Sequence, residues 1–198
     1  MEETTSTNDE ELISRYYQAD QEALKMLFKR HKDGLFNFAL RFVGNRADAE
    51  DAVSHTFMMV CEKRYAIKPG ASFKTWAYTV ARNICLSRLR TKSRFFSLWS
   101  PKSDPDHDQA IDVVDPQSIA RDQFSSKEIL GIIQKAIQKL PDEQKQALLL
   151  REYNGFTYEE IAQVLECSLE KVKMLIFRAR NHLKDVLPPV ILEGEGLK

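Results

Sequence analysis

Apolar residues recur every three or four positions along most of this chain of 198 residues, and that spacing limits its fold more than any other feature. Between residues 21 and 43 the spacing brings Leu24, Leu27, Leu35 and Phe38 onto one side of a helix. A half-buried strand would instead alternate apolar and polar residues, and we find no segment with that alternation. The sequence therefore predicts an all-α fold.

Polar residues and helix breakers mark where the predicted helices begin and end. Side chains that can accept a hydrogen bond from a free backbone N–H group precede them. These are Asp9, Asp20, Asp48, Ser72, Thr157 and Ser168. Helices are expected over residues 10–18, 21–43, 49–63, 73–94, 118–140 and 141–153, with two more before the prolines at 188 and 189.

One stretch, "SLWSPKSDPDHDQAIDVVDPQS", interrupts the helical pattern. It is rich in Ser, Pro and Asp, and its acidic residues repel one another, so we expect an extended flexible linker. We therefore predict a four-helix domain (residues 1–95), an acidic linker (96–116), a smaller helix-turn-helix domain (117–187) and a short tail (188–198).

The charges cancel in total, with 29 basic and 29 acidic residues, but they are segregated along the chain. Residues 1–22 are strongly acidic, whereas between Glu62 and Asp104 every charged residue is a cation. Aspartates then follow without a cation as far as Asp115, and the last helix is basic again. Such blocks indicate that basic surfaces for a polyanion are separated by acidic segments.

The composition disfavours a cysteine metal site, a secreted protein and a membrane-spanning protein. Cys61, Cys85 and Cys167 lie far apart and form no metal-binding pair, which is typical of reduced thiols in an intracellular protein. The acidic start is unlike a signal peptide, and no apolar run approaches the roughly 20 residues of a membrane span. We therefore expect a cytoplasmic protein without membrane insertion.

The stretch "YEEIAQVLECSLEKVKMLIFRAR" (residues 158–180) has the pattern of two helices joined by a very short turn. Ile161 and Leu165 on the first helix can face Val172 and Ile176 on the second, as in a helix-turn-helix. In that motif the second helix enters the major groove of DNA. The cations expected on its exposed side are Lys171, Lys173, Arg178 and Arg180.

The same pattern also fits a helical hairpin with a solvated basic face. Glu166 stands in the turn, where a helix-turn-helix usually has glycine in a left-handed conformation. A glutamate there costs on the order of 1 kcal/mol. We also expect Leu175 to face the core of this domain.

Residues 63–94 combine many cations with aromatic rings. Aromatic rings beside a basic groove suit unpaired nucleic acid, because bases stack on the rings and phosphates pair with Lys and Arg. The spacing of the rings also fits a buried stripe of a helix. We therefore expect Trp76, Val80 and Ile84 in the core and Phe73 in a more open position.

Three acids, Asp48, Glu50 and Asp51, lie near the start of a predicted helix. Negative charge at a helix N-terminus stabilises it, typically by about 0.3–1 kcal/mol. The same acids could instead bind a partner protein, and the sequence leaves both roles open.

Motifs in both halves of the chain resemble those of one protein family. The first half carries "NRADAEDAVSHTFMMV" and "PGASFKTWAYTVARNICLSRLR". The second half carries "LPDEQKQALLLREYNGFTYEEIAQVLECSLEKVKMLIFRARNHL". In this order they resemble the two domains of an extracytoplasmic-function (ECF) sigma factor of bacterial RNA polymerase.

The resemblance implies a role for each domain and no cofactor or metal. The first domain would bind the polymerase clamp and capture the melted minus-ten element of a promoter, and the second would bind the polymerase flap and read the minus-thirty-five element. An anti-sigma factor is a further partner that the family allows. The residues implied in polymerase binding are Asp48, Glu50, Asp51 and Phe57. Those implied at the minus-ten element are Lys68, Ser72, Phe73, Lys74, Arg82, Asn83, Arg88, Arg90 and Arg94. Those implied at the minus-thirty-five element are Ser168, Lys171, Lys173, Met174, Phe177, Arg178 and Arg180.

Two other functions remain as alternatives. A stand-alone helix-turn-helix regulator would explain residues 158–180, but it would leave the basic run of the first domain without a role. An enzyme would need a catalytic site, and the best candidate is Asp51 with His55, together with Glu50 or His31. We do not expect catalysis, because these groups form no constellation with convergent roles.

Overall fold

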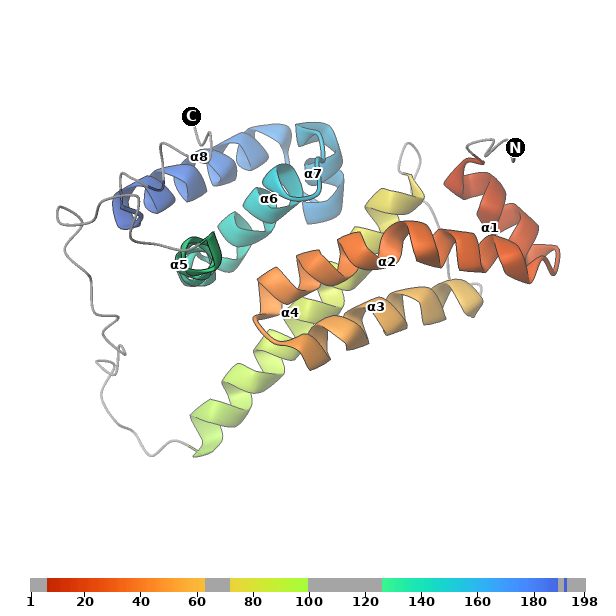
Figure 1. Ribbon diagram of the computed structural model, residues 1–198, viewed down its shortest axis with the longest axis horizontal. Coiled ribbons are helices and arrows are strands. Elements are labelled where there is room, and N and C mark those ends of the chain that lie inside the picture. The colour runs from red at the N-terminus through yellow and green to blue at the C-terminus, as the bar shows by residue number, and fades with distance from the viewer. Residues whose placement is uncertain (1–6, 63–71, 100–125, 189–190, 192–198) are drawn as a thin grey trace.

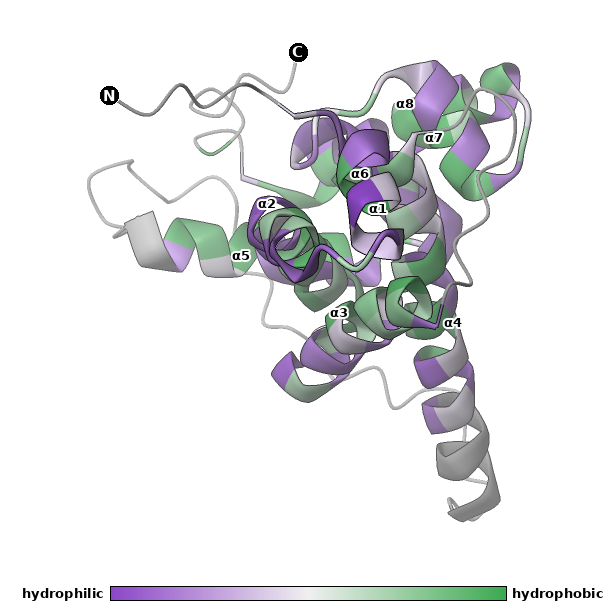
Figure 2. Ribbon diagram, turned by 90° about the vertical axis from the view of Figure 1, so that its right-hand side faces the viewer, coloured by the Kyte–Doolittle hydropathy of each residue, from purple (hydrophilic) through white to green (hydrophobic). Residues whose placement is uncertain are grey.

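The computed structural model describes residues 7–62, 72–99, 126–188 and 191, and of residues 93–99 and 126–127 it describes only the backbone. These residues form eight α-helices and no strand, which confirms the all-α prediction. The helices are α1 (Asp9–Tyr17), α2 (Gln21–Val43), α3 (Arg46–Cys61), α4 (Phe73–Trp99), α5 (Ser126–Lys139), α6 (Asp142–Glu152), α7 (Tyr158–Leu165) and α8 (Leu169–Val186). Each is banded with hydrophobic and hydrophilic residues, as amphipathic helices are (Figure 2).

The first four helices make the first domain. Helices α2, α3 and α4 lie alongside one another, and α1 packs against α2 at one end of the group (Figure 1). Their shared core combines leucines and phenylalanines of α2 with small, branched and aromatic side chains of α3 and α4. Its fully buried members include Leu27, Leu35, Phe38, Phe42, Ala49, Val60, Ala77, Ala81 and Cys85.

The last four helices make the second domain. Helix α6 packs against α8, and α7 and α8 form the predicted helix-turn-helix. Ile161 and Leu165 face Val172 and Ile176 in its core, and Leu175 is buried too, as the sequence predicted. The two domains lie directly against each other, with α4 beside α7 and α2 beside α5 and α6 (Figure 1).

Most predicted helix starts are confirmed. Asp20 accepts hydrogen bonds from the backbone N–H groups of Glu22 and Ala23, and Ser72 accepts one from Thr75. Thr157 and Ser168 cap α7 and α8 in the same way. These caps satisfy backbone donors that have no partner within the helix.

Two predicted starts are wrong, because asparagines cap α1 and α3. Asn8 and Asn45 make the cap hydrogen bonds in place of Asp9 and Asp48. The two aspartates lie inside their helices, where Asp9 binds Arg30 and His31 of α2 and Asp48 binds Lys92 of α4. An aspartate near a helix start can therefore serve a tertiary ion pair, which its spacing in the sequence does not reveal.

The buried face of α4 is turned from the predicted one. Phe73 was expected in an open position, yet its side chain is fully buried. Trp76 and Ile84 are only partly buried against the core, and Val80 is half-buried. The buried line runs instead from Phe73 through alanines to Cys85. Small residues on this line let α4 approach its neighbours closely, which a stripe of large residues would prevent.

Gly34 lies inside α2, where glycine costs about 1 kcal/mol relative to alanine. Helix α2 nevertheless runs from Gln21 to Val43, so Gly34 does not interrupt it. A Cβ atom at this position would lie 2.7 Å from the hydroxyl oxygen of Tyr78 on α4. The close approach of the Tyr78 side chain therefore explains why glycine occupies position 34.

The turn between α7 and α8 places Glu166 in the left-handed region, with φ of 54°. We predict that Glu166→Gly raises the free energy of unfolding by about 0.5–1 kcal/mol, because glycine adopts this conformation without a clash at Cβ. Urea denaturation of the two proteins measures the difference. The matched control is Glu159→Gly within α7, which should lower stability by a similar amount, since glycine disfavours an ordinary helix. A loss of stability for Glu166→Gly would contradict this account of the turn.

Asp9 holds α1 on α2 through His31, at 2.7 Å, and through Arg30. Burial alone would raise the pKa of Asp9, but hydrogen bonds and charges of His31 and Arg30 outweigh it and lower the pKa below 3.8. The contribution of Asp9 is therefore complete above about pH 4 and is lost as the pH falls through its lowered pKa. We predict that Asp9→Asn costs about 1–2 kcal/mol at pH 7 and less in acid. Unfolding by urea at pH 7 and pH 3 tests this, and an equal cost at both values would contradict it.

Candidate functional site

The second helix of the helix-turn-helix, α8, presents a mixed polar and apolar face to solvent. Lys173 and Arg178 are exposed and have no ion-pair partner within the part of the chain that the structure describes. Met174 and Phe177 lie beside them, with exposed fractions of 40% and 64%. Because these four residues lie one helical turn apart in two pairs, they form one continuous surface.

Two other cations of α8 are engaged by α6. Lys171 forms an ion pair with Glu143 at 2.8 Å, and Arg180 forms one with Glu152 at 2.6 Å. The hydrogen bond that Lys171 donates to Glu143 raises the pKa of Lys171. The predicted exposed cations are thus divided into two that are open to solvent and two that also tie α8 to α6.

On the first domain, cations of α4 reach back to acids of α3. Arg88 binds Asp51 at 3.0 Å, and Lys92 binds Asp48. The hydrogen bond from Lys92 is the main cause of a lowered pKa of Asp48. Ion pairs between such exposed side chains contribute about 0–1 kcal/mol, so a stronger partner can displace them.

The remaining residues predicted to bind the polymerase differ in exposure. Glu50 is exposed and pairs with Arg46 at 2.7 Å, one turn along α3. Phe57 is 6% exposed, and its ring packs edge-on against Phe28 with centroids 4.9 Å apart. Phe57 therefore lies beneath the surface of α3.

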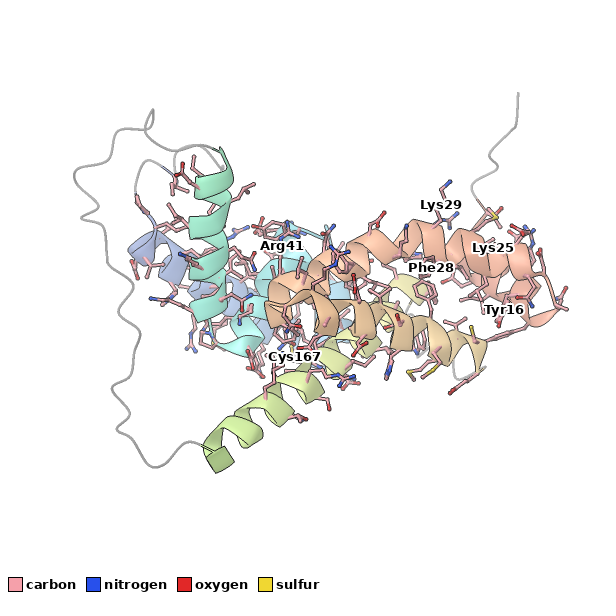
Figure 3. The ribbon with its side chains drawn as sticks, turned by 60° about the horizontal axis from the view of Figure 1, so that its bottom comes forward. Tyr16, Lys25, Phe28, Lys29, Arg41 and Cys167 are labelled. Carbon is pink, nitrogen blue, oxygen red and sulfur yellow. The ribbon has the colours of Figure 1, made fainter. Side chains whose placement is uncertain are left out.

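An apolar groove lies beside this aromatic pair. It has a volume of about 220 Å³ and is lined by Leu24, Lys25, Phe28 and Phe57. Figure 3 shows Phe28 and Lys25 along the same side of α2.

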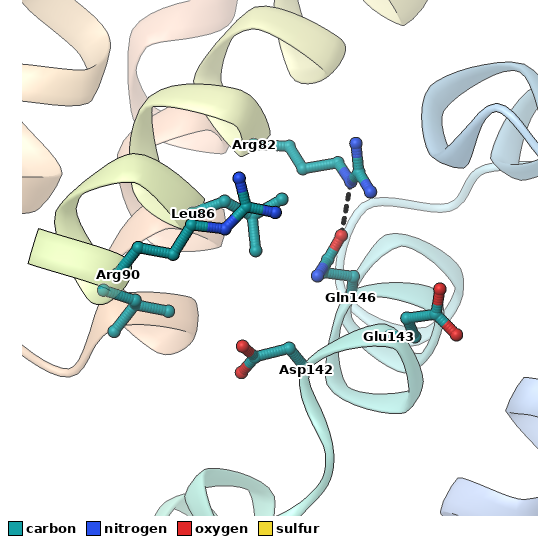
Figure 4. Close-up of a pocket in the computed structure, with 7 residues that line it drawn as sticks. Arg82, Leu86, Arg90, Asp142, Glu143 and Gln146 are labelled. Carbon is teal, nitrogen blue, oxygen red and sulfur yellow. Dashed lines mark hydrogen bonds between the residues drawn. The ribbon is translucent and has the colours of Figure 1, made fainter. Parts of the chain in front are cut away.

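Lys74 and Arg82, both predicted at the minus-ten element, instead contact the second domain. The ammonium group of Lys74 donates to the backbone carbonyl of Asn154 at 3.1 Å and lies 4.1 Å from the ring centroid of Phe156. Arg82 donates from Nε to the side-chain oxygen of Gln146 on α6 (Figure 4). Burial lowers the pKa of Arg82, although nearby acids oppose that shift.

A cleft of about 600 Å³ lies between α4 and α6, beside the Arg82–Gln146 hydrogen bond (Figure 4). The first domain lines it with guanidinium groups and leucines, and the second lines it with acids and an amide. Its lining residues are Arg82, Leu86, Leu89, Arg90, Asp142, Glu143 and Gln146. The opposite charges of the two walls attract, which favours contact between the domains.

The other residues predicted at the minus-ten element lie in different environments. Asn83 and Arg90 are exposed on α4, and Asn83 accepts a hydrogen bond from Arg82 at 3.0 Å. Ser72 is half-buried and caps α4, and Phe73 is fully buried.

For two further residues of that set, Arg94 and Lys68, the structure does not describe the side chain. Arg94 lies in the part of α4 whose backbone alone is described. Lys68 lies outside the described residues.

Helix α1 contacts the end of α3 and the start of α4. The hydroxyl of Tyr17 donates to the carbonyl of Val60 on α3 at 3.3 Å. The backbone N–H of Phe73 on α4 donates to the carboxylate of Glu10 at 3.1 Å. These contacts could not be predicted from the sequence, since neither residue type nor spacing indicates a bond across 43 or 63 positions.

The catalytic alternative gains no support from geometry. His31 is held by Asp9, and its ring packs edge-on against Phe73 with centroids 5.2 Å apart. In the described ranges no group of three His, Cys, Asp or Glu residues could hold a metal ion. Among those same residues no helix is long and apolar enough to span a membrane.

Two family models match the chain, one in each domain. Residues 27–95 match the family described as "Sigma-70 region 2", and residues 130–183 match the family described as "Sigma-70, region 4". The second match contains α6, α7 and most of α8. The first contains α3 and the basic part of α4.

Relatives that match along almost their whole length are named as RNA polymerase sigma factors. The chain is 29% identical to the RNA polymerase sigma-H factor of Pseudomonas aeruginosa, over 96% of this chain and 99% of that protein. It is 28% identical to the ECF RNA polymerase sigma-E factor of Escherichia coli strain K12, over 92% of this chain and 96% of that protein.

Solved structures share the fold. The sigma factor RpoE in complex with the anti-sigma factor NepR, from Bartonella quintana, matches with a TM-score of 0.62 and 26% identity, over 86% of this chain and 97% of that one. CnrH, in a complex with the cytosolic domain of CnrY, matches with a TM-score of 0.63 and 21% identity, over 89% and 95% of the two chains. Since two regions of one family match more than half of the sequence in order, and the full-length relatives agree, this chain belongs to the sigma-70 family of bacterial RNA polymerase sigma factors, in its extracytoplasmic-function (ECF) branch.

Proposed function

We propose that this sigma factor binds core RNA polymerase through α3 and directs initiation by contacting promoter DNA with α4 and α8. The observation that carries the assignment is the exposed face of α8, where two cations without ion-pair partners among the described residues stand beside two exposed apolar side chains. Such a face on the second helix of a helix-turn-helix suits the major groove.

At the minus-thirty-five element, Lys173 and Arg178 would contact phosphates or base edges, and Met174 and Phe177 would contact thymine methyl groups and sugars. Both kinds of contact suit their side chains, because cations neutralise phosphates and apolar groups pack on methyls. Ser168 would hold the start of α8, and its hydroxyl already accepts the backbone N–H of Lys171 at 3.2 Å. Lys171 and Arg180 would reach phosphates only by leaving Glu143 and Glu152.

At the minus-ten element, Asn83 and Arg90 would meet DNA first, since both are exposed on α4. Arg88, Arg94 and Lys68 would bind the DNA backbone. Lys74 and Arg82 would contact DNA only after their hydrogen bonds to the second domain are broken. We leave Ser72 and Phe73 as supports of α4, because one is its cap and the other is buried.

On the polymerase side, Asp48, Glu50 and Asp51 would exchange their present cations for those of the clamp. Each already binds a cation within the chain, which supports a surface that prefers positive partners. Phe57 would support this surface from beneath. The two domains act by avidity, since two weak DNA contacts at fixed spacing on a large scaffold bind far more tightly than either alone.

We also propose the domain bounds, the absence of catalysis and the cellular location. Residues 1–95 and 117–187 would be the two working domains, joined by the acidic linker 96–116 and followed by the tail 188–198. The protein would act without catalysis of its own, in the cytoplasm, where core polymerase and promoters are found. A stand-alone regulator of duplex DNA is not favoured, because the region 2 match occupies the whole first domain beyond residue 27.

The experiment that tests the function is initiation by purified core RNA polymerase on genomic DNA fragments, with the transcripts sequenced. A sigma factor should give transcripts whose start sites share two upstream motifs. Tight binding to duplex DNA by the protein alone, without transcription dependent on core polymerase, would contradict the proposal.

Substitution on α8 tests the residue roles. We predict that Lys173→Ala and Arg178→Ala each reduce initiation at promoters with a minus-thirty-five element by roughly fivefold to 100-fold, because each removes a contact to a phosphate or base. The matched control is Lys139→Ala, an exposed lysine of α5 away from the helix-turn-helix. An equal loss on promoter fragments truncated upstream of the minus-ten element would show that these residues do not read the upstream duplex.

A further inference from the structure

We propose that Glu10 and Tyr17 of α1 are positioning residues for minus-ten recognition, because they hold the start of α4 and the end of α3 in place. We name these two residues and their bonds the α1 clasp. This inference deepens the proposed function and rests on it, since Lys68 lies between the two held ends in the sequence and Lys74 follows them directly. Helix α1 ends before the region 2 match begins at residue 27, so that match gives it no role.

Glu10 gives the first backbone donor of α4 an acceptor from another helix. The N–H group of Phe73 lies at the start of α4, where a backbone donor has no partner within its own helix. It donates to the carboxylate of Glu10 at 3.1 Å. A carboxylate also suits the positive end of the helix dipole. Ser72 completes this end of α4 by accepting a hydrogen bond from the backbone N–H of Thr75.

The side chain of Phe73 is held as closely as its backbone. Its ring is fully buried, meets the ring of His31 on α2 edge-on with centroids 5.2 Å apart, and stacks with Trp76 at 5.7 Å. His31 in turn bonds the carboxylate of Asp9 at 2.7 Å. Asp9 and Glu10 are consecutive in α1, so one acid holds Phe73 through its backbone and the other through the His31 ring.

At the other end of α1, Tyr17 holds the last turn of α3. Its hydroxyl donates to the carbonyl of Val60 at 3.3 Å, and carbonyls in the last turn of a helix have acceptor capacity that the helix does not use. Beside it, Tyr16 hydrogen-bonds the side chain of Cys61, where α3 ends, and this bond raises the pKa of the Tyr16 hydroxyl. Two neighbouring tyrosines therefore contact two neighbouring residues of α3.

The geometry of α1 fixes the two contacts relative to each other. Glu10 and Tyr17 are seven positions apart, so they lie on one face of the helix, separated by two turns or roughly 10 Å. Leu12 and Ile13 between them are buried and anchor the helix in the first core. Figure 1 shows α1 at the end of the group where α3 ends and α4 begins. The clasp therefore connects these two helix ends through one anchored element.

The clasp bears on base recognition because discrimination between bases needs fixed geometry. A side chain that is held in place rejects a base that does not fit it, whereas a looser side chain adapts to that base. Release of either helix end would therefore lower discrimination at the minus-ten element. Contacts to phosphates carry no sequence information, so those proposed for Arg88 and Arg94 would persist.

The first experiment tests the clasp in the full chain without DNA. Hydrogen exchange of the Phe73 amide is measured by NMR. Glu10→Gln should raise the exchange rate roughly threefold to tenfold, and Glu10→Ala should raise it more, because a charged acceptor forms a stronger hydrogen bond than a neutral one. The matched control is Glu11→Gln, which removes the same charge from the exposed neighbouring acid and should leave the rate unchanged. An unchanged rate in Glu10→Ala would overturn the clasp.

The second experiment measures discrimination by the holoenzyme. A promoter found by the initiation experiment is randomised across its minus-ten element, its upstream motif is kept, and the transcripts made by core polymerase with each variant are sequenced. Glu10→Gln and Tyr17→Phe should each lower the preference for the best base roughly threefold to tenfold, the effect of one weakened hydrogen bond. The controls on α1 are Glu11→Gln and Ser14→Ala, both at exposed positions, and they should keep the native preference.

This readout separates positioning from a general loss of stability. The preference is a ratio between minus-ten sequences that compete in one reaction. A smaller folded fraction lowers all transcripts alike and leaves that ratio unchanged. Tyr17→Phe removes only the hydroxyl and keeps the ring, so its expected effect comes from the bond to Val60.

The outcomes distinguish this inference from the proposed function. If the Glu10 and Tyr17 variants lose transcription equally from all minus-ten sequences and keep the native preference, the positioning role is overturned, although the protein remains a sigma factor. If the native protein gives no transcription dependent on core polymerase, the proposed function fails and the inference fails with it. A lowered preference in both variants, with native preference in both controls, would support the α1 clasp as a determinant of minus-ten specificity.

Discussion

Close packing of α4 along a line of small residues is the constraint on which the rest of this structure depends. After the buried Phe73, the small residues Ala77, Ala81 and Cys85 form a buried line that lets the helix lie close against α2 and α3. The other sides of α4 are available for polar contacts. One side reaches the acids of α3, another the second domain, and a third faces solvent.

That division explains how a chain without net charge can still present surfaces for nucleic acid. Acids and cations are separated in sequence, yet the fold pairs many of them, as Arg88 with Asp51 and Lys171 with Glu143. Such exposed pairs are weak and exchange readily with other charged partners. A polyanion or a cationic protein surface can therefore take over one member of each pair without large rearrangement of the domains.

Much of the fold was predictable from local chemistry. The helix starts at Asp20, Ser72, Thr157 and Ser168 followed from capping residues, and the buried face of the helix-turn-helix followed from periodicity. The failures have a common cause. Asp9 and Phe73 were misplaced because the groups that hold them, His31 and Glu10 among others, come from another helix. Of the candidate site, the exposed positions of Lys173 and Arg178 on α8 followed from helical spacing.

The sequence by itself determined that the chain is all-α, that it holds two helical domains, and that one helix near its end carries a basic exposed face. These properties depend on spacing, capping and charge within short segments, and such interactions need no distant partner. Only the tertiary structure decided that α4 turns Lys74 and Arg82 towards the second domain, and that Asn154 meets Tyr78 over Gly34. Those contacts join positions more than 60 residues apart, and complementarity of shape and hydrogen bonding between two finished surfaces selects them.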